Sequence, residues 1–446
     1  MDKSNYYGRR VLVNWVDQQQ QADPAIKVLP TIAVHAQTIR CYRCNTETSK
    51  RLAALPNGEY YCPHCINLGR VSTLDKFYHV PEPNQFTVKK PVLSWHGQLS
   101  PLQERAAKQV ASRMKDHQRQ LLWAVTGAGK TEMMFKGLAA CLARRERIAI
   151  ASPRVDVCLE LYPRLQVAFV NTDMAILHAH QELPYHYAQL TICTTHQLLR
   201  FYHAFDNLII DEVDAFPFAA SPALFFASRQ AVKKNGGILY LTATPSTGMI
   251  KQVRRQQLAV TYLPLRYHGA LLPTIHRYLA PRWRHQIKRG TLPASLLRRM
   301  RLAVANKHRF LLFVPHVDDL ASVAAACRRS LAGLKFTTVH ASDPHRLSKV
   351  QGMRDHQYTF LITTSILERG VTFPEIDVLV LGADDEIFST AALVQIAGRA
   401  GRSAKRPTGH VGFWVSAHRK NVQQAVRQIN SMNRKGRDCQ SEVSHL

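Results

Sequence analysis

Short apolar runs alternate with longer amphipathic segments through most of the chain. In the first half the runs are Ile148–Ile150, Leu190–Ile192, Asn207–Ile210 and Ile238–Leu241. After a break between Leu263 and Pro281 they return at Phe310–Val314, Phe336–Val339, Phe360–Ile362, Val378–Leu381 and Val411–Val415. Apolar runs of this length between helical patterns are typical of buried parallel strands. The pattern predicts an α/β fold with two parallel sheets, each flanked by helices.

The 446 residues exceed what one hydrophobic core usually holds, so we expect several domains. The predicted division is an N-terminal segment at 1–38, a cysteine-containing module at 39–75, an α/β domain at 76–264, a linker at 265–282 and a second α/β domain at 283–446. No apolar run is long enough to cross a bilayer, and Met1–Tyr7 lacks the apolar centre of a signal peptide. A cytoplasmic location is therefore expected.

The formal net charge of +28 is concentrated in one part of the sequence. No Asp or Glu occurs in the 103 residues from Ala215 to Val317, which contain seventeen Lys or Arg residues. Aromatic residues, among them Tyr278 and Trp283, lie between these basic residues. Such a region favours a nucleic-acid partner over a solubility feature or a membrane-surface patch.

Two Cys-x-x-Cys pairs predict a metal site. They are Cys41 with Cys44 and Cys62 with Cys65, and seventeen residues separate the pairs. Two such knuckles close a tetrahedron of thiolates around Zn²⁺, whereas redox-active pairs are the less favoured alternative in a reducing compartment. Four sulfur ligands leave no open coordination position, so the zinc is expected to be structural. Nearby basic residues leave both DNA and protein open as the module's partner; these are Arg43, Lys50, Arg51 and Arg70.

The remaining five cysteines show no disulfide pattern. Four of them lie in apolar segments and are predicted to be small core residues, namely Cys141, Cys158, Cys193 and Cys327. Cys439 lies in a polar segment near the C-terminus.

A Gly-rich segment, Ala124–Thr131, follows the apolar run Leu121–Val125 and precedes the amphipathic stretch Glu132–Leu142. Strand, loop and helix in this order predict a phosphate-binding loop. Lys130 is expected to reach the β- and γ-phosphates of a nucleotide, and the Thr131 hydroxyl to ligate Mg²⁺. The nucleotide-binding loop residues are Thr126, Gly127, Ala128, Gly129 and Lys130.

Acidic residues follow a later apolar run, at Asp211–Asp214. We expect Asp211 to hold Mg²⁺ and Glu212 to orient and deprotonate the attacking water, although acids at a strand end can also cap a helix. Thr242 and Thr244 end the next predicted strand, and their hydroxyls are placed to hydrogen-bond Asp214 and couple the site to a moving neighbour.

The second half contains Gln395–Arg402, a predicted helical segment with Arg399 and Arg402 on one face. Guanidinium groups in this arrangement are expected to reach the γ-phosphate as arginine fingers, and Gln395 to contact the nucleotide or the water. The alternative is a basic surface helix.

These segments, in this order, resemble the motif series of superfamily 2 helicases from about residue 95 to 415. The resemblance implies two RecA-like domains with ATP in the cleft between them and a single nucleic-acid strand across their tops. It implies that Gln103 reads the adenine base. It also implies strand contacts from three loops, with the residues Ser152, Arg154, Thr194, Thr195, His196, Thr363, Thr364 and Ser365.

Within that superfamily, the cysteine module in front of the first motor domain resembles the ComFA late-competence family. Ala151–Val157, Asp211–Asp214 and Leu265–His268 are also similar. The resemblance implies ATP-driven uptake of transforming DNA at the inner face of the cell membrane. It further implies a ComFC-type, phosphoribosyltransferase-like partner and a membrane DNA-channel protein. The primosomal restart helicase is also similar, but its metal-binding insertion lies within the second motor half.

The sequence thus predicts an ATP-dependent, single-stranded DNA translocase that uses ATP, Mg²⁺ and Zn²⁺. Two alternatives stay open: a helicase that unwinds duplex DNA or RNA, and a non-catalytic adaptor that uses ATP as a structural ligand. A zinc nuclease is disfavoured because the four-cysteine site lacks an open position.

Overall fold

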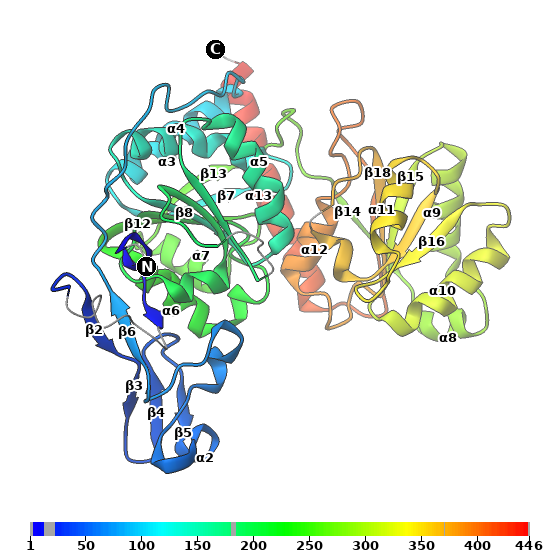
Figure 1. Ribbon diagram of the computed structural model, residues 1–446. Coiled ribbons are helices and arrows are strands. Elements are labelled where there is room, and N and C mark those ends of the chain that lie inside the picture. The colour runs from blue at the N-terminus through cyan, green and yellow to red at the C-terminus, as the bar shows by residue number, and fades with distance from the viewer. Residues whose placement is uncertain (1–2, 13–22, 180–183, 370, 445–446) are drawn as a thin grey trace. The chain divides into compact units, whose positions relative to one another are not determined.

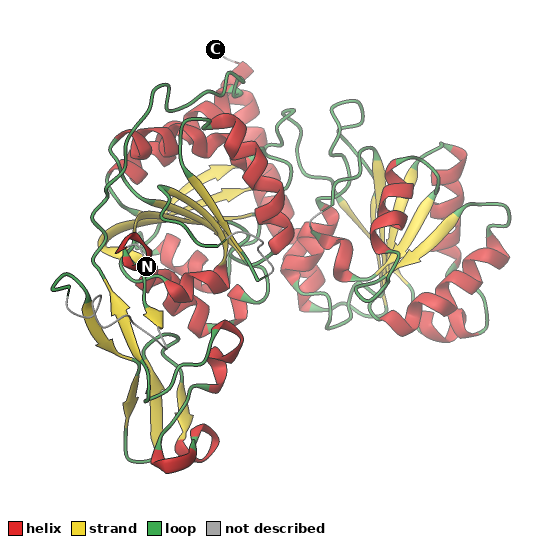
Figure 2. Cartoon of the chain, viewed as in Figure 1, coloured by secondary structure: helices red, strands yellow, loops and turns green. Residues whose placement is uncertain are grey.

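The computed structural model describes residues 3–12, 23–179, 184–369 and 371–444. The chain divides into two compact units, one formed by Met1–Leu122 and Lys130–Thr261 and the other by Trp123–Gly129 and Tyr262–Leu446. The described residues form four sheets, two of them large and two small. Each large sheet has helices on both faces (Figures 1 and 2), as the α/β pattern predicted.

The first large sheet has seven strands in the order β13-β7-β12-β11-β8-β10-β9. Its strands are β7 (Arg119–Ala124), β8 (Ile148–Ser152), β9 (Met174–Leu177), β10 (Leu190–Thr194), β11 (Phe205–Ile210), β12 (Val232–Thr242) and β13 (Ala259–Leu263). The accompanying helices are α3 (Pro101–Lys115), α4 (Lys130–Ala143), α5 (Val155–Ala168), η4 (Thr195–Arg200), η5 (Phe218–Ala220), α6 (Pro222–Ala231) and α7 (Thr247–Arg254). All five strands predicted in this half are present, including β7 at the run Leu121–Val125.

The central strands are buried on both faces, which explains their continuous apolar sequences. Every residue of β8, β10 and β11 is buried. These strands pair in parallel, with Ser152 beside Thr194 and Ala151 beside Ile210. Their carboxyl ends therefore meet at one edge of the sheet, where ligands of open α/β folds usually bind.

The second large sheet has six strands in the order β14-β19-β18-β15-β17-β16, and all neighbours are parallel. The strands are β14 (Ile275–Leu279), β15 (Arg309–Phe313), β16 (Phe336–Val339), β17 (Phe360–Thr363), β18 (Ile376–Leu381) and β19 (Val411–Val415). The helices are α8 (Trp283–Lys288), α9 (Ala294–Ala305), α10 (Val317–Ser330), α11 (Arg346–Arg354), η6 (Ser365–Glu368), α12 (Thr390–Ala397) and α13 (Lys420–Ser444). Strand β14 lies within the range predicted as a linker.

Two three-stranded sheets precede the first large sheet in the sequence. Their orders are β1-β6-β2 and β3-β4-β5. The elements are η1 (Lys3–Tyr6), β1 (Val11–Leu12), β2 (Lys27–Pro30), β3 (Ile32–Val34), β4 (Thr38–Cys41), β5 (Glu47–Ser49), α2 (Lys50–Ala53), η2 (Pro56–Gly58), η3 (Pro63–Leu68) and β6 (Lys76–His79). Within η2, Asn57 adopts a left-handed backbone conformation with a φ of 65°.

A buried ion pair ties this N-terminal region to the first large sheet. Nη1 of Arg147 lies 2.6 Å from Oε2 of Glu82, and both side chains are fully buried. The same guanidinium donates to the Tyr7 carbonyl at 3.0 Å and to the Tyr185 hydroxyl at 2.7 Å. Burial alone lowers the pKa of Arg147, but Tyr185 and Glu82 outweigh it and raise the pKa above its ordinary value. The stretch Val80–Asn84 is therefore anchored at Glu82.

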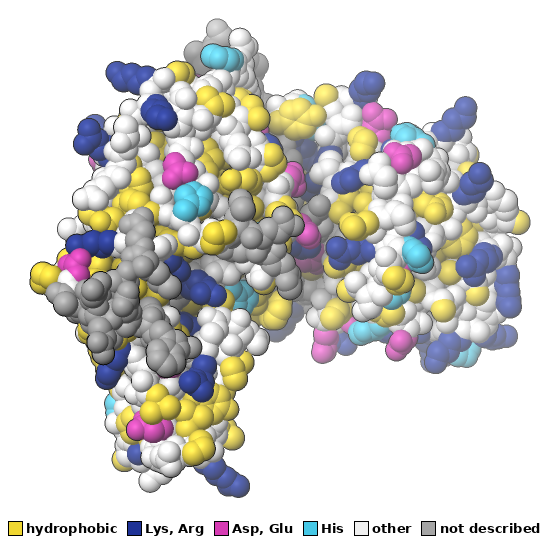
Figure 3. Space-filling view, viewed as in Figure 1, with side chains coloured by type: hydrophobic (Ala, Val, Ile, Leu, Met, Phe, Trp, Pro, Cys, Tyr) yellow, Lys and Arg dark blue, Asp and Glu magenta, His cyan; other side chains and the backbone are white. Residues whose placement is uncertain are grey.

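Acidic residues outside the stretch Ala215–Val317 form ion pairs with some of its basic residues. Arg284 forms ion pairs with Asp319 and Asp385, and Arg299 pairs with Asp377. Trp283 is buried in the core of the second unit, where Tyr278 stacks on Trp414 with ring centroids 4.7 Å apart. Trp283 is therefore a core residue, and Tyr278, which is partly buried, packs against the same core. On the face drawn in Figure 3, Lys and Arg are nevertheless widespread and Asp and Glu are few.

The cysteine predictions outside the metal site are confirmed. Cys141, Cys158, Cys193 and Cys327 are buried free thiols. Burial raises the pKa of Cys158 and of Cys327 to about 12, so both stay protonated at neutral pH. Among the helices that the structure describes, none is long and apolar enough to cross a membrane.

Candidate ATPase and zinc sites

Lys130 and Asp211 meet at the carboxyl edge of the first large sheet. Lys130 is the first residue of α4, and Asp211 follows β11. Their side chains form an ion pair with Nζ 3.2 Å from Oδ1. Burial alone lowers the pKa of Lys130, but the carboxylates of Asp211, Glu212 and Asp214 outweigh burial and raise it. The lysine is therefore held as a cation inside an acidic site.

The loop before Lys130 has the backbone form of a phosphate-binding loop. Gly127 and Gly129 have φ values of 77° and 74°, in the left-handed region that glycine adopts without strain. Thr131 lies in the first turn of α4, where backbone N–H groups have no intrahelical acceptor and the helix dipole attracts anions. A lysine, a helix N-terminus and nearby carboxylates fit a nucleotide phosphate with Mg²⁺, and Thr131 and Asp211 are the residues that would hold the cation.

Glu212 lies at a bend immediately after the strand. Its φ is 53°, and its backbone N–H donates to Oδ1 of Asp211 at 2.8 Å. This bend turns the Glu212 backbone away from the path of β11 while Asp211 stays at the strand end. The arrangement separates the two acids into a cation-binding position and a position suited to a general base.

Asp214 links β11 to the following strand. Oδ1 of Asp214 accepts a hydrogen bond from the Thr242 hydroxyl at 2.5 Å, and its other oxygen accepts one from the Thr244 hydroxyl. The two predicted hydrogen bonds are thus confirmed. Both threonines are buried, at 0% and 4% exposure, so Asp214 is fixed by donors that water cannot easily replace.

Gln103 lies in the first turn of α3. Its backbone N–H donates to the Ser100 hydroxyl at 3.4 Å, and its side-chain oxygen accepts from the Ser100 N–H at 2.9 Å. These bonds form a capping box that starts the helix. The structure therefore gives Gln103 a helix-capping role, and adenine recognition stays a prediction.

The arginine motif of the second unit differs from the helix that the sequence predicted. Helix α12 ends at Ala397, and Gly398 is its C-cap. Arg399 and Arg402 follow the helix, and Gly401 before Arg402 adopts a φ of 69°, which is not helical. Gln395 remains in the helix and is buried.

Both arginines of this turn are held by neighbouring backbone and hydroxyl groups. Nε of Arg399 donates to the Glu368 carbonyl at 3.0 Å, and the side chain is 2% exposed. Arg402 donates to the Gly398 carbonyl at 3.3 Å and to the Thr372 hydroxyl at 3.1 Å. Their predicted role at the γ-phosphate stays a prediction.

Arg266 belongs to the same part of the second unit and was not singled out from the sequence. It is 2% exposed, and its guanidinium donates to the carbonyls of Gly401 and Gly398. Burial, and then the charge of Arg402, lower the pKa of Arg266 to about 9. Its position within Leu265–His268 was the available sequence signal.

The residues predicted to contact DNA fall into two groups. In the first unit, Ser152 and Thr194 end paired strands, Arg154 is half-buried before α5, and His196 is exposed. Thr195 is fully buried.

In the second unit Thr363 is fully buried and donates to the Val339 carbonyl at 3.0 Å. Ser152, Thr194 and Thr364 are buried as well. Of the residues predicted to contact DNA, only Arg154, His196 and Ser365 are therefore at least partly exposed. Gly370, in the same predicted loop, lies outside the described residues.

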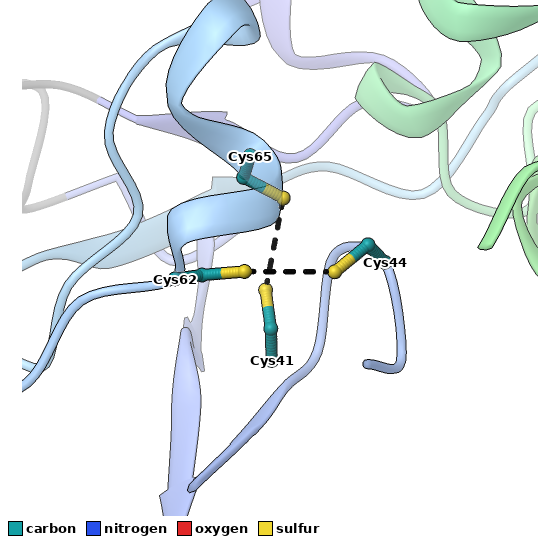
Figure 4. Close-up of side chains that lie close together, drawn as sticks. All are labelled: Cys41, Cys44, Cys62 and Cys65. Atoms are coloured by element: carbon teal, nitrogen blue, oxygen red, sulfur yellow. Dashed lines mark hydrogen bonds between the residues drawn. The ribbon is translucent and has the colours of Figure 1, made fainter. Parts of the chain in front are cut away.

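The four cysteines of the N-terminal module form one cluster. Their sulfur atoms all lie within 4.8 Å of one another, and all four residues are buried. Cys41 and Cys65 are 3.9 Å apart at sulfur, and Cys44 and Cys62 are 3.6 Å apart (Figure 4). Tetrahedral zinc with Zn–S bonds of about 2.3 Å places its sulfurs about 3.8 Å apart. The cluster therefore fits a structural zinc ion and is too wide for disulfides.

Three family models match the chain in order. The model described as Competence protein ComFA N-terminal domain matches residues 10–79. Type III restriction enzyme, res subunit, matches 96–247, and Helicase conserved C-terminal domain matches 293–404.

Two curated proteins are similar over most of their length. Competence protein ComFA of Bacillus subtilis (strain 168) is 39% identical over 90% of this chain and 87% of its own. Competence protein ComFA of Streptococcus pneumoniae (strain ATCC BAA-255 / R6) is 36% identical over 96% of this chain and 98% of its own.

Solved helicase structures share the fold. S. cerevisiae Dbp5 bound to RNA and ADP BeF3 matches with a TM-score of 0.51 and 14% identity, over 75% of this chain and 91% of that chain. RecG bound to a three-way DNA junction matches with a TM-score of 0.50 and 18% identity, over 75% of this chain and 45% of that chain. The two α/β units thus have the RecA-like helicase fold, and the sequence-based prediction of the fold is confirmed.

Proposed function

Because the chain belongs to the ComFA competence family, we propose that it is an ATP-driven motor that moves along single-stranded DNA during uptake of transforming DNA. The helicase-type domains identify an ATP hydrolase related to competence. Dependence of the hydrolysis on DNA, movement along one strand and the role in uptake are the proposed steps.

The observation that carries this proposal is the joined network at the carboxyl edge of the first sheet. Lys130 pairs with Asp211, and three residues further on Asp214 is bonded to Thr242 and Thr244. On the same edge, Ser152 and Thr194 end the neighbouring strands β8 and β10. A change at the phosphate site therefore has a short covalent and hydrogen-bonded path to the ends of β8 and β10, where we expect the contacts with the DNA strand.

Each residue of this network has a distinct task in the proposed reaction. When bound, ATP with Mg²⁺ supplies the phosphoanhydride bond and the cation that neutralises part of its charge. Lys130 exchanges its contact with Asp211 for one with phosphate oxygens, which frees the Asp211 carboxylate for the cation. Glu212 accepts a proton from the attacking water, and Arg399 and Arg402 balance charge on the transferred phosphoryl group.

Membership of the ComFA family also leads us to propose binding partners. Single-stranded DNA is the substrate along which the motor moves, through backbone contacts that give little sequence preference. A ComFC-type protein and a membrane DNA-channel protein are the proposed protein partners, at the cytoplasmic side of the membrane. Co-purification of the chain with each candidate, with and without DNA, tests these assignments.

The experiment that tests the activity compares ATP hydrolysis with single-stranded DNA, RNA and duplex DNA. We expect single-stranded DNA to stimulate hydrolysis most, and stimulation to fall as salt is raised. A displacement assay on a tailed duplex then separates strand separation from translocation. Equal rates with and without every nucleic acid would contradict the proposal, and the absence of hydrolysis under all conditions would favour the non-catalytic adaptor.

A further inference from the structure

Two adjoining pockets lie between the zinc module and the first large sheet, both within the first unit. The first has a volume of about 510 Å³ and is lined by Pro153, Thr194 and His196 on one side and by Leu68 of the zinc module on another. The second has a volume of about 410 Å³. They share Arg9, Leu68 and Arg200, so they form one continuous groove.

Five arginines gather in this groove, and no acidic residue among the described parts of the chain forms an ion pair with them. Three belong to the second pocket alone, and they are Arg10, Arg43 and Arg70. The other two, Arg9 and Arg200, line both pockets. Separate segments thus bring to one place positive charge that no described acidic side chain pairs with, and such charge attracts an anionic ligand.

Neutral groups hold these arginines in position. The Arg9 guanidinium lies 3.7 Å from the ring centroid of Tyr185, and that of Arg10 lies 3.9 Å from the centroid of Tyr202. Arg10 also donates to Oε1 of Gln230 at 2.9 Å. Burial, opposed by Tyr185 and assisted by the charge of Arg200, lowers the pKa of Arg9 to about 10, so the side chain stays charged at neutral pH. Aromatic rings and carbonyl groups orient the guanidinium groups but carry no negative charge themselves.

The zinc module shapes one wall of the groove. Arg43 lies between Cys41 and Cys44, is 4% exposed and donates to the Gly69 carbonyl at 2.9 Å and the Leu68 carbonyl at 3.3 Å. The η3 helix contains Cys65 and ends at Leu68. Both Cys-x-x-Cys pairs therefore help to fix the position of Leu68–Arg70, the first through Arg43 and the second through Cys65 of η3.

We propose that this groove binds the phosphate backbone of single-stranded DNA and continues the strand path from Thr194 and His196 onto the zinc module. The inference rests on the proposed function and extends it, because it gives the zinc module a direct task in strand binding. Several arginines beside the exposed His196, with the partly exposed Tyr185 in the same wall, are the combination that binds single strands without reading sequence.

The test measures binding of the full chain to labelled oligodeoxythymidines of increasing length over a range of salt concentrations. The variant is Arg70→Ala with Arg200→Ala, and Arg70→Glu alone is a second variant at an exposed position. The matched control is Arg51→Ala with Lys76→Ala, which removes two exposed positive charges from the same region outside both pockets. Zinc content and melting temperature report whether each variant is folded.

We expect the double variant to bind long oligonucleotides roughly five- to thirtyfold more weakly than the control. The dependence of log affinity on log salt should become shallower by about 0.7 for each phosphate that the variant no longer neutralises. Arg70→Glu should weaken binding in the same direction. If both variants bind like the control while wild type binds normally, the groove has another occupant, such as an acidic protein segment, and only this inference is overturned. Failure of wild type to bind any single strand would overturn the proposed function as well.

Discussion

The ammonium nitrogen of Lys130 lies 3.2 Å from Oδ1 of Asp211, so the residue expected to bind phosphate is paired with the residue expected to bind Mg²⁺. Each partner neutralises the other within a cluster that also contains Glu212 and Asp214. This ion pair stabilises the acidic edge of the sheet. When a nucleotide phosphate binds with its cation, Lys130 would pair with the phosphate and Asp211 with the cation.

Lys130→Ala should reduce ATP hydrolysis by at least about a hundredfold, because it removes the cation that faces the phosphates. DNA binding should persist, since Lys130 is not among the predicted strand contacts. The measurement is steady-state phosphate release together with DNA binding. Lys136→Ala is the control, because Lys136 lies on the same helix and pairs with Glu104 at the surface. Normal turnover in Lys130→Ala would refute the assignment of the loop.

Thr244→Val should lower the ratio of DNA-stimulated to unstimulated ATP hydrolysis. The substitution removes one hydroxyl donor to Asp214 and leaves Thr242 as its remaining threonine partner. Loss of a buried donor to a carboxylate also costs about 1–3 kcal/mol of stability, which a melting curve will detect. Thr247→Val, at an exposed position shortly after, should change neither quantity. An unchanged stimulation ratio in Thr244→Val would rule out the coupling role.

Elemental analysis should find about one zinc ion per chain, because the four sulfurs match one tetrahedral site. Cys65→Ser should lose the metal and lower the melting temperature, whereas Cys439→Ser, outside the cluster, should keep it. Chelation of the wild-type protein should reproduce the Cys65→Ser result. A wild-type protein that is fully folded and metal-free would exclude the zinc site.

Stability should fall as the pH is lowered from about 6.5 to about 4, in part through His79. Burial, and to a smaller extent the nearby charge of Arg10, lower the pKa of His79 from 6.5 to about 4, against the effect of its contact with the Arg9 carbonyl. In this window the unfolded chain binds a proton that the folded chain does not, so acid favours unfolding.

His79→Asn keeps a donor for the Arg9 carbonyl and removes the titration, so its melting temperature should depend less on pH than that of wild type. His35→Asn, at an exposed histidine, is the control. Parallel pH profiles for His79→Asn and wild type would show that His79 does not contribute.

The sequence predicted the central strands because parallel strands buried on both faces have continuous apolar sequences, as in Ile148–Ile150 and Phe310–Val314. Strand β14 was missed because it lies at a sheet edge and contains His276 and Arg277 among its apolar residues. The β1-β6-β2 sheet was also beyond prediction, since it pairs Val11 with Tyr78 across a long separation in sequence.

In the candidate sites, too, local features could be predicted from the sequence and contacts between distant segments could not. Spacing was enough to find the four cysteines and the acids after β11, because those motifs are local. The end of α12 at Ala397 was missed although Gly398 and Gly401 are both helix-ending signals. The groove could be found only from the fold, because segments far apart in the sequence contribute to it, among them those of Arg9, Arg70 and Arg200.

Movement along single-stranded DNA is the central claim, and displacement of streptavidin from an end-biotinylated oligonucleotide measures it most directly. Wild type with ATP and Mg²⁺ should release streptavidin from single-stranded DNA faster than from RNA of the same length. Glu212→Gln should bind ATP and DNA yet release none, because it lacks the carboxylate that accepts the proton from water. Release by wild type that is independent of ATP, or equal release by Glu212→Gln, would contradict the account.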